Sequence, residues 1–149
     1  MTTAPRFLRS LPPGVRDRLM EHGREVSFPQ DARIFEEGGQ ATGFWVIRSG
    51  AVTLDLRVTD RRSATVATLG PGDLLGWSWL FPPYEWDFGA EALSPVRTYA
   101  FDGFQVRAMC DEDPVLGLVL MRTVAEILAH RLQAARTRLL EMSPHIVTV

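Results

Sequence analysis

Few residues of this sequence have types and spacings that suit metal binding. Its histidines are dispersed over a predicted first helix, a predicted long helix and the tail: His22, His130 and His145. Metal sites need His, Cys or carboxylate ligands in a cluster, and a metal-dependent barrel enzyme would carry them on its strands. The spacing therefore predicts no metal site.

Candidate nucleophiles also lack the surroundings that catalysis needs. Residues 76–80 begin like the G-x-S-x-G turn of serine hydrolases, but Leu80 stands where the second glycine belongs. The single cysteine, Cys110, precedes Asp111 and Glu112, whose charges disfavour a thiolate. Walker and Rossmann glycine patterns are absent from the sequence. We therefore predict no catalytic residues, no cofactor and no enzyme activity.

Aromatic residues are concentrated in one segment, residues 72–92, which carries three of the four tryptophans. Glycines and prolines interrupt this segment and predict an irregular, sharply turning backbone. Aromatic side chains bury large areas or stack on flat ligands, so the segment is either a hydrophobic plug of a β-barrel or the wall of a ligand pocket. The residue types alone favour the plug. On the second interpretation, the candidate ligand-binding residues are Gly76, Trp77, Ser78, Trp79, Tyr84, Trp86, Asp87 and Phe88.

Length and composition indicate one cytoplasmic domain spanning residues 1–149. A net charge of −2 gives no strong attraction to nucleic acid or to an anionic membrane. One cysteine excludes an internal disulfide and fits a reducing compartment. The start of the sequence lacks the apolar core of a signal peptide, and the longest apolar run, 115–121, is far shorter than a membrane span.

Residues 24–101 have the pattern of a β-barrel or sandwich. Apolar and polar residues alternate most clearly over Val52–Val58, which places Val52, Leu54, Leu56 and Val58 on one face. Shorter candidate strands cover 26–28, 34–35, 44–47, 66–69 and 96–101. Many short strands separated by regular turns predict a mainly β fold. Helices are expected on both sides of it, one at residues 10–23 and others within 102–149.

The long C-terminal helix is predicted to cover residues 114–142. Asp113-Pro114 is a typical helix start, and Ser143-Pro144 is expected to end the helix, which would be roughly 43 Å long. Apolar residues recur along it at alternating spacings of three and four: Met121, Ala125, Leu128, Leu132, Ala135, Leu139 and Met142. This heptad seam predicts a parallel homodimer; the alternative is a helix that lies on its own barrel. Its arginines are expected on the solvated face: Arg122, Arg131, Arg136 and Arg138.

The order of these features resembles the cyclic-nucleotide-binding domain superfamily of bacterial catabolite-activator-type regulators. Residues 35–54, FEEGGQATGFWVIRSGAVTL, match its E-x-G turn, aromatic-aliphatic strand and glycine turn. Residues 69–77, LGPGDLLGW, match the approach to its phosphate-binding cassette. The resemblance implies a cupin-like jelly-roll barrel over 24–101, a cassette at 72–92 and a long dimerisation helix.

The cassette departs from the family pattern at both ligand contacts. The family uses a glutamate to hold the ribose 2′-hydroxyl and an arginine to pair with the cyclic phosphate. Here Gly76 matches, but Trp77 occupies the glutamate position and Trp86 the arginine position. Four acids in the segment would repel an anion: Asp73, Glu85, Asp87 and Glu91. These departures predict weak or absent binding of cyclic AMP and cyclic GMP.

Two hypotheses for the function follow. In the first, a stand-alone regulatory dimer senses a small neutral or cationic ligand against Trp77, Trp79, Tyr84 and Trp86. In the second, its own aromatics fill the pocket and the dimer is a ligand-free protein-interaction module. The directions of Trp77 and Trp86 would distinguish them. Family transcription factors continue into a helix-turn-helix domain, whereas this sequence ends at Val149, so we expect no DNA binding by the chain alone.

Overall fold

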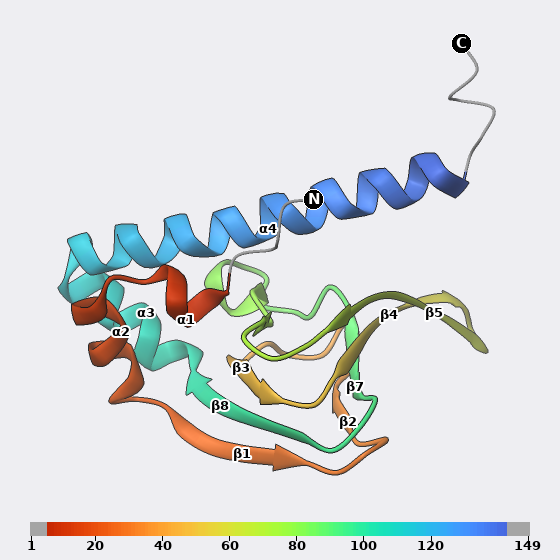
Figure 1. The fold of residues 1–149 in the computed structure, drawn as a ribbon, viewed down its shortest axis with the longest axis horizontal. Coiled ribbons are helices and arrows are strands. Elements are labelled where there is room, and N and C mark those ends of the chain that lie inside the picture. The colour runs from red at the N-terminus through yellow and green to blue at the C-terminus, as the bar shows by residue number, and fades with distance from the viewer. Residues whose placement is uncertain (1–5, 143–149) are drawn as a thin grey trace.

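The computed structural model describes residues 6–142 and places two four-stranded antiparallel sheets beside a layer of helices (Figure 1). One sheet has the order β1 (Arg24–Phe28), β8 (Val96–Asp102), β3 (Gly43–Ser49), β6 (Leu74–Leu75). The other has the order β2 (Arg33–Phe35), β7 (Gly89–Ala92), β4 (Val52–Thr59), β5 (Arg62–Leu69). The predicted mainly β jelly-roll fold with flanking helices is confirmed.

Apolar side chains from both sheets meet in the barrel core. The buried members come from six strands, β3 to β8: Ile47, Val52, Leu54, Leu69, Leu75, Ala90, Ala92 and Val96. Burying such side chains contributes about 1.5–3 kcal/mol for each large residue. A second core cluster joins the barrel to the helices and includes Phe7, Phe44 and Trp79.

The predicted alternation of β4 is correct at its start and wrong at its end. Register shifts between Leu54 and Asp55 and between Arg57 and Thr59 interrupt the alternation. Asp55 is buried, and the end of the strand is exposed, including Val58 at 65%. Arg33 of β2 compensates the buried carboxylate, donating from Nη1 and Nη2 to its two oxygens at 2.5 and 2.7 Å. The hydrogen bonds to Asp55 raise the pKa of Arg33 above its ordinary value.

Only part of the N-terminal helix predicted at residues 10–23 is formed, as α2 (Pro13–Met20), and a separate turn of helix, α1 (Phe7–Ser10), precedes it. Leu11 and Pro12 between them are extended, with ψ angles of 141° and 147°. A residue that precedes proline disfavours the helical conformation, and both Leu11 and Pro12 precede a proline. Pro13 then occupies the first turn of α2, where proline needs no hydrogen-bond partner.

The long C-terminal helix begins where the sequence predicts, and a shorter helix precedes it. The Asp102 carboxylate caps α3 (Gly103–Glu112), accepting from the Gln105 N–H at 3.0 Å. Asp113 precedes α4 (Pro114–Met142) and accepts from the Leu116 N–H at 3.2 Å. That hydrogen bond, and a second from Arg18, hold the pKa of Asp113 below its usual value. The predicted stop at Ser143-Pro144 and the histidine His145 lie outside the described residues.

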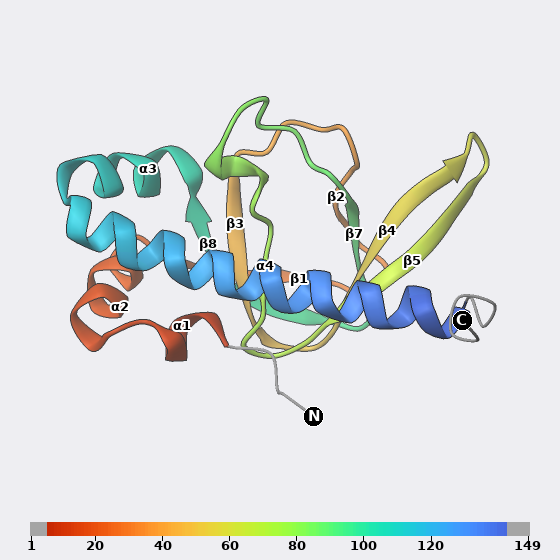
Figure 2. The same cartoon turned by 90° about the horizontal axis from the view of Figure 1, so that it is seen from above.

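Helix α4 carries two apolar stripes with different surroundings. In Figure 2 it crosses the whole barrel, from the end near α2 and α3 to the β4–β5 hairpin. One stripe packs inward and is buried: Leu116, Leu120, Val124 and Ile127. The predicted heptad seam is divided: Met121 and Leu128 pack against the core of the domain, whereas Leu132 is 64% exposed and Leu139 62% exposed. Leu118 continues the seam by one step and is also exposed. No helix among residues 6–142 is both long and apolar enough to cross a membrane.

Candidate ligand-binding site

The segment 72–92 folds into short elements separated by tight turns. It contains β6, the 3₁₀ helix η1 (Ser78–Leu80) and β7. Gly76 has a φ of +97°, and a Cβ placed there would lie 2.8 Å from the Trp86 ring. Glycine is therefore required at this position for both backbone and space, because other residues rarely adopt positive φ. The turn brings Trp86 against the inside of the barrel.

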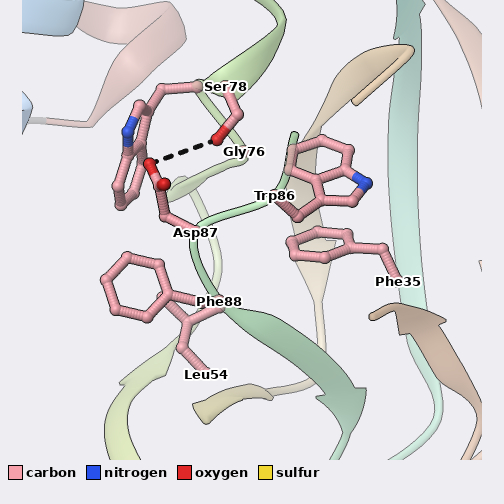
Figure 3. Close-up of a pocket in the computed structure, with 8 residues that line it drawn as sticks. Phe35, Leu54, Gly76, Ser78, Trp86, Asp87 and Phe88 are labelled. Carbon is pink, nitrogen blue, oxygen red and sulfur yellow. Dashed lines mark hydrogen bonds between the residues drawn. The ribbon is translucent and has the colours of Figure 1, made fainter. Parts of the chain in front are cut away.

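Trp86 fills the interior of this segment. It is 5% exposed and stacks on Phe35 with 3.9 Å between ring centroids (Figure 3). The space left beside the two rings is about 10 Å³, enough for one water molecule at most. Ser78 and Asp87 line it, with a hydrogen bond of 3.5 Å from the serine hydroxyl to the carboxylate. This part of the segment is a hydrophobic plug.

Trp79 and Tyr84 lie elsewhere. Trp79 is fully buried, stacks on Phe44 at 4.6 Å and donates from Nε1 to the Gly76 carbonyl at 3.2 Å. Tyr84 faces α3, where the Arg107 guanidinium lies 4.6 Å from its ring centroid. These two aromatics therefore stabilise the attachment of the segment to the barrel and to α3.

A much larger cavity of about 540 Å³ separates the β4–β5 hairpin and the start of the segment from α4. Its volume falls in the range typical of small-molecule sites. Its walls are mainly apolar, including Leu54 and Leu69 from the strands and Trp77 and Phe88 from the segment. Helix α4 contributes the remaining wall: His130, Arg131, Ala134, Ala135 and Arg138.

Two arginines of α4 tie the helix to the barrel at this cavity. Arg138 donates from Nη1 to the Val66 carbonyl at 2.6 Å, and Arg131 donates from Nη2 to the Leu74 carbonyl. The Arg131 guanidinium also lies 5.8 Å from the centroid of the Trp77 ring. Burial lowers the pKa of Arg131, and the nearby Asp73 charge opposes that change. The expectation that Arg131 lies on the solvated face of the helix is wrong.

Comparison with known proteins identifies the family to which this architecture belongs. The model of the cyclic nucleotide-binding domain family matches residues 25–113. The chain belongs to this family.

Relatives of the cyclic nucleotide-binding domain resemble the chain over most of its length. A CRP-like cAMP-activated global transcriptional regulator of Mycobacterium tuberculosis is 25% identical over 91% of the chain, which spans 59% of that relative. A structure from Geobacter metallireducens, assigned as a cyclic nucleotide-binding protein, is 31% identical and has a TM-score of 0.75. The match covers 89% of the present chain and 99% of the Geobacter chain. The Thermus thermophilus catabolite activator protein is 26% identical and has a TM-score of 0.74. The match covers 93% of the present chain and 63% of the Thermus chain.

The structure divides the candidate site residues of this cyclic nucleotide-binding domain into three groups. Trp77 and Phe88 line both the large cavity and the edge of the small one. Gly76, Ser78, Trp86 and Asp87 line only the small one. Trp79 and Tyr84 line neither of these two cavities. Tyr84 instead lines a separate cavity of about 500 Å³ beside α3. A ligand-binding role for any of these residues stays a prediction.

The α4 residues of the cavity escaped the sequence-based reasoning. The structure brings Arg131 to Leu74 although they are far apart in the sequence. One signal was present: Arg131 follows Ile127 by four residues and so continues the buried stripe of Leu120, Val124 and Ile127. An arginine on the inward face of an amphipathic helix indicates a buried polar contact.

Replacing Gly76 with alanine tests the packing of Trp86 inside the barrel. The new Cβ would strain the backbone and displace the Trp86 ring, so we expect a loss of about 1–3 kcal/mol in unfolding free energy and a shift in tryptophan emission. Urea titration followed by fluorescence measures both. Gly70→Ala is the control, since a Cβ at Gly70 meets nothing within 4 Å. Equal stability of the two variants would contradict the packing described here.

Proposed function

We propose that the chain is a dimeric regulatory domain, not an enzyme, that senses a small molecule in the cavity between the β4–β5 hairpin and α4. The observation that carries this proposal is the difference between the two cavities. The cassette interior, closed by Trp86, leaves about 10 Å³, whereas the cavity under α4 offers about 540 Å³. A ligand there would contact the barrel, the cassette and α4 together.

The names of the relatives support a regulatory role sensitive to small molecules. The Mycobacterium tuberculosis relative is named as a cAMP-activated transcriptional regulator, and the chain spans 59% of its length. Cyclic AMP itself is not proposed as the tight ligand here, because tryptophans occupy the positions of the glutamate and arginine that the family uses.

Within residues 6–142, no three His, Cys, Asp or Glu side chains gather as a metal site would require.

Assembly through α4 is the second part of the proposal. Three leucines at seam spacing, Leu118, Leu132 and Leu139, are exposed, although Met121 and Leu128 of the same seam pack on the domain's own core. Exposed leucines at heptad spacing are typical of a coiled-coil interface. The second copy of the chain is the occupant that this repeat fits, since a parallel pair aligns each leucine with its equivalent.

A ligand-free interaction module is the competing function. The observation in its favour is the stack of Trp86 on Phe35, which fills part of the barrel with the domain's own aromatics. The half-buried Trp77 at the larger cavity favours ligand binding instead. The two hypotheses therefore differ in whether the cavity under α4 is occupied in the protein as it is produced.

Native mass spectrometry of freshly purified protein distinguishes them. We expect the mass of a dimer plus a small molecule that is released on denaturation, at up to one molecule per protomer. Replacing Ala134 with tryptophan should abolish the added mass by filling the cavity. A dimer that carries no adduct, and in which a small-molecule screen finds no ligand, would favour the interaction module.

A further inference from the structure

One guanidinium at the cavity wall has an unused hydrogen-bond donor. Arg131 Nη2 is bound to the Leu74 carbonyl, but the buried Nη1 has no hydrogen-bond partner among residues 6–142. Buried donors in native proteins are nearly always paired, because an unpaired one loses its hydration without replacement. The unpaired nitrogen therefore requires a partner that the described chain does not supply.

The charges around Arg131 do not supply that partner. Asp73 is the carboxylate that influences it, yet Asp73 Oδ2 accepts from the Gly70 N–H at 2.8 Å. The ion pairs formed within residues 6–142 involve other arginines: Arg18, Arg33 and Arg48. The cavity wall thus carries two arginines, Arg131 and Arg138, and one carboxylate, together with the imidazole of His130. This balance favours an anionic group.

The rest of the cavity favours an apolar body. Trp77 and Phe88 meet edge to face, with 5.4 Å between ring centroids, and both line the cavity. Leu54, Leu69 and other strand residues continue the apolar wall on the side of the barrel. Apolar walls with few placed polar groups are typical of sites that orient a ligand through its head group.

We propose that the cavity binds a small apolar carboxylate. Its body packs against Trp77 and Phe88, and its head draws the Arg131 side chain into a position where the now buried Nη1 can donate to it. This inference rests on the proposed function, because it names the ligand class of the same site. It reverses the neutral or cationic ligand predicted from the sequence.

The positions of the four acids explain this reversal. Of the four, only Asp73 lines the cavity. Glu91 pairs with Arg33 at 3.7 Å, Asp87 accepts from Ser78, and Glu85 is exposed.

A matched pair of probes tests the ligand class. 2-Naphthoate and its neutral amide, 2-naphthamide, are titrated into the full chain by calorimetry. We expect the acid to bind roughly ten- to a hundred-fold more tightly, the difference expected for one charge-assisted hydrogen bond. This preference should fall to about one in Arg131→Gln, by the same reasoning. Arg136→Gln removes an exposed arginine of the same helix and should keep the preference.

The variant Ala134→Trp, which places an indole in the cavity, separates the location of the binding site from the chemical class of its ligand. It should lose both probes. Equal binding of acid and amide by the wild type, or tighter binding of the amide, would overturn the carboxylate and leave the cavity as the site. Binding of neither probe, or unchanged binding in Ala134→Trp, would overturn the cavity as well. Thermal unfolding of each variant without probe checks its fold, and the wild-type preference does not depend on any variant.

Discussion

Replacing Leu132 with glutamate is expected to convert a dimer of this chain into monomers. Leu132 lies near the middle of the exposed seam of α4, and in a parallel pair it meets its own copy. Each buried leucine contributes about 1.5–3 kcal/mol, so losing one from each protomer costs about 3–6 kcal/mol. That cost corresponds to about two to four decades in the dissociation constant, before repulsion between the two carboxylates is added.

Sedimentation equilibrium at micromolar concentration measures this change directly. Gln133→Glu is the matched control: it adds the same charge at the next, exposed residue, which points away from the seam. We expect the control to stay dimeric. A monomeric wild type, or monomers from both variants alike, would contradict the seam as the interface.

Cyclic AMP is expected to show no saturable binding at low micromolar concentration. The indole of Trp77 can only donate a hydrogen bond, and Trp86 is uncharged and buried against Phe35. Losing two charge-assisted hydrogen bonds costs about 3–6 kcal/mol, or about two to four decades in affinity. Stacking of the purine on an aromatic ring returns only about 1–3 kcal/mol.

Tryptophan emission and calorimetry, each followed to about 100 µM ligand, cover the range of a micromolar site. Adenosine is the control, because it lacks the phosphate: a cassette that does not recognise the phosphate should bind both compounds equally weakly. A saturable transition with cyclic AMP in both signals, absent with adenosine, would show that the phosphate is bound after all. Arg131→Gln would then identify whether α4 supplies the cation.

The start of the long helix and most of the strands could be predicted from local patterns, whereas the bounds of the N-terminal helix could not. The Asp113-Pro114 pair predicts the start of α4 at residue 114, which the structure reproduces, and the helix continues to the last described residue, Met142. β6, with two residues, and β7, with four, are too short for alternation to reveal them. The bulge in β4 was also hidden, because Asp55 is accommodated only by Arg33 from another strand.

The candidate site was only partly predictable, since its geometry depends on distant contacts. Trp77 follows a glycine and Trp86 stands between two acids, yet it is Trp77 that lines the open cavity and Trp86 that fills the core. What separates them is Phe35, which comes from β2 and stacks on Trp86. Likewise, the four acids of the segment suggested a site that repels anions. The sequence did not reveal that arginines from the distant helix α4 line the same cavity.

Ala135 belongs to both of the surfaces of α4 to which we assign a proposed role. It lines the cavity and it is a member of the heptad seam. A ligand in the cavity and a second copy on the seam would therefore share one small side chain on one rigid helix. Thermodynamic linkage is reciprocal, so any factor by which ligand strengthens dimerisation is the factor by which dimerisation strengthens ligand binding. If both proposals hold, a shift of the helix at Ala135 that accompanies one binding event would be felt by the other.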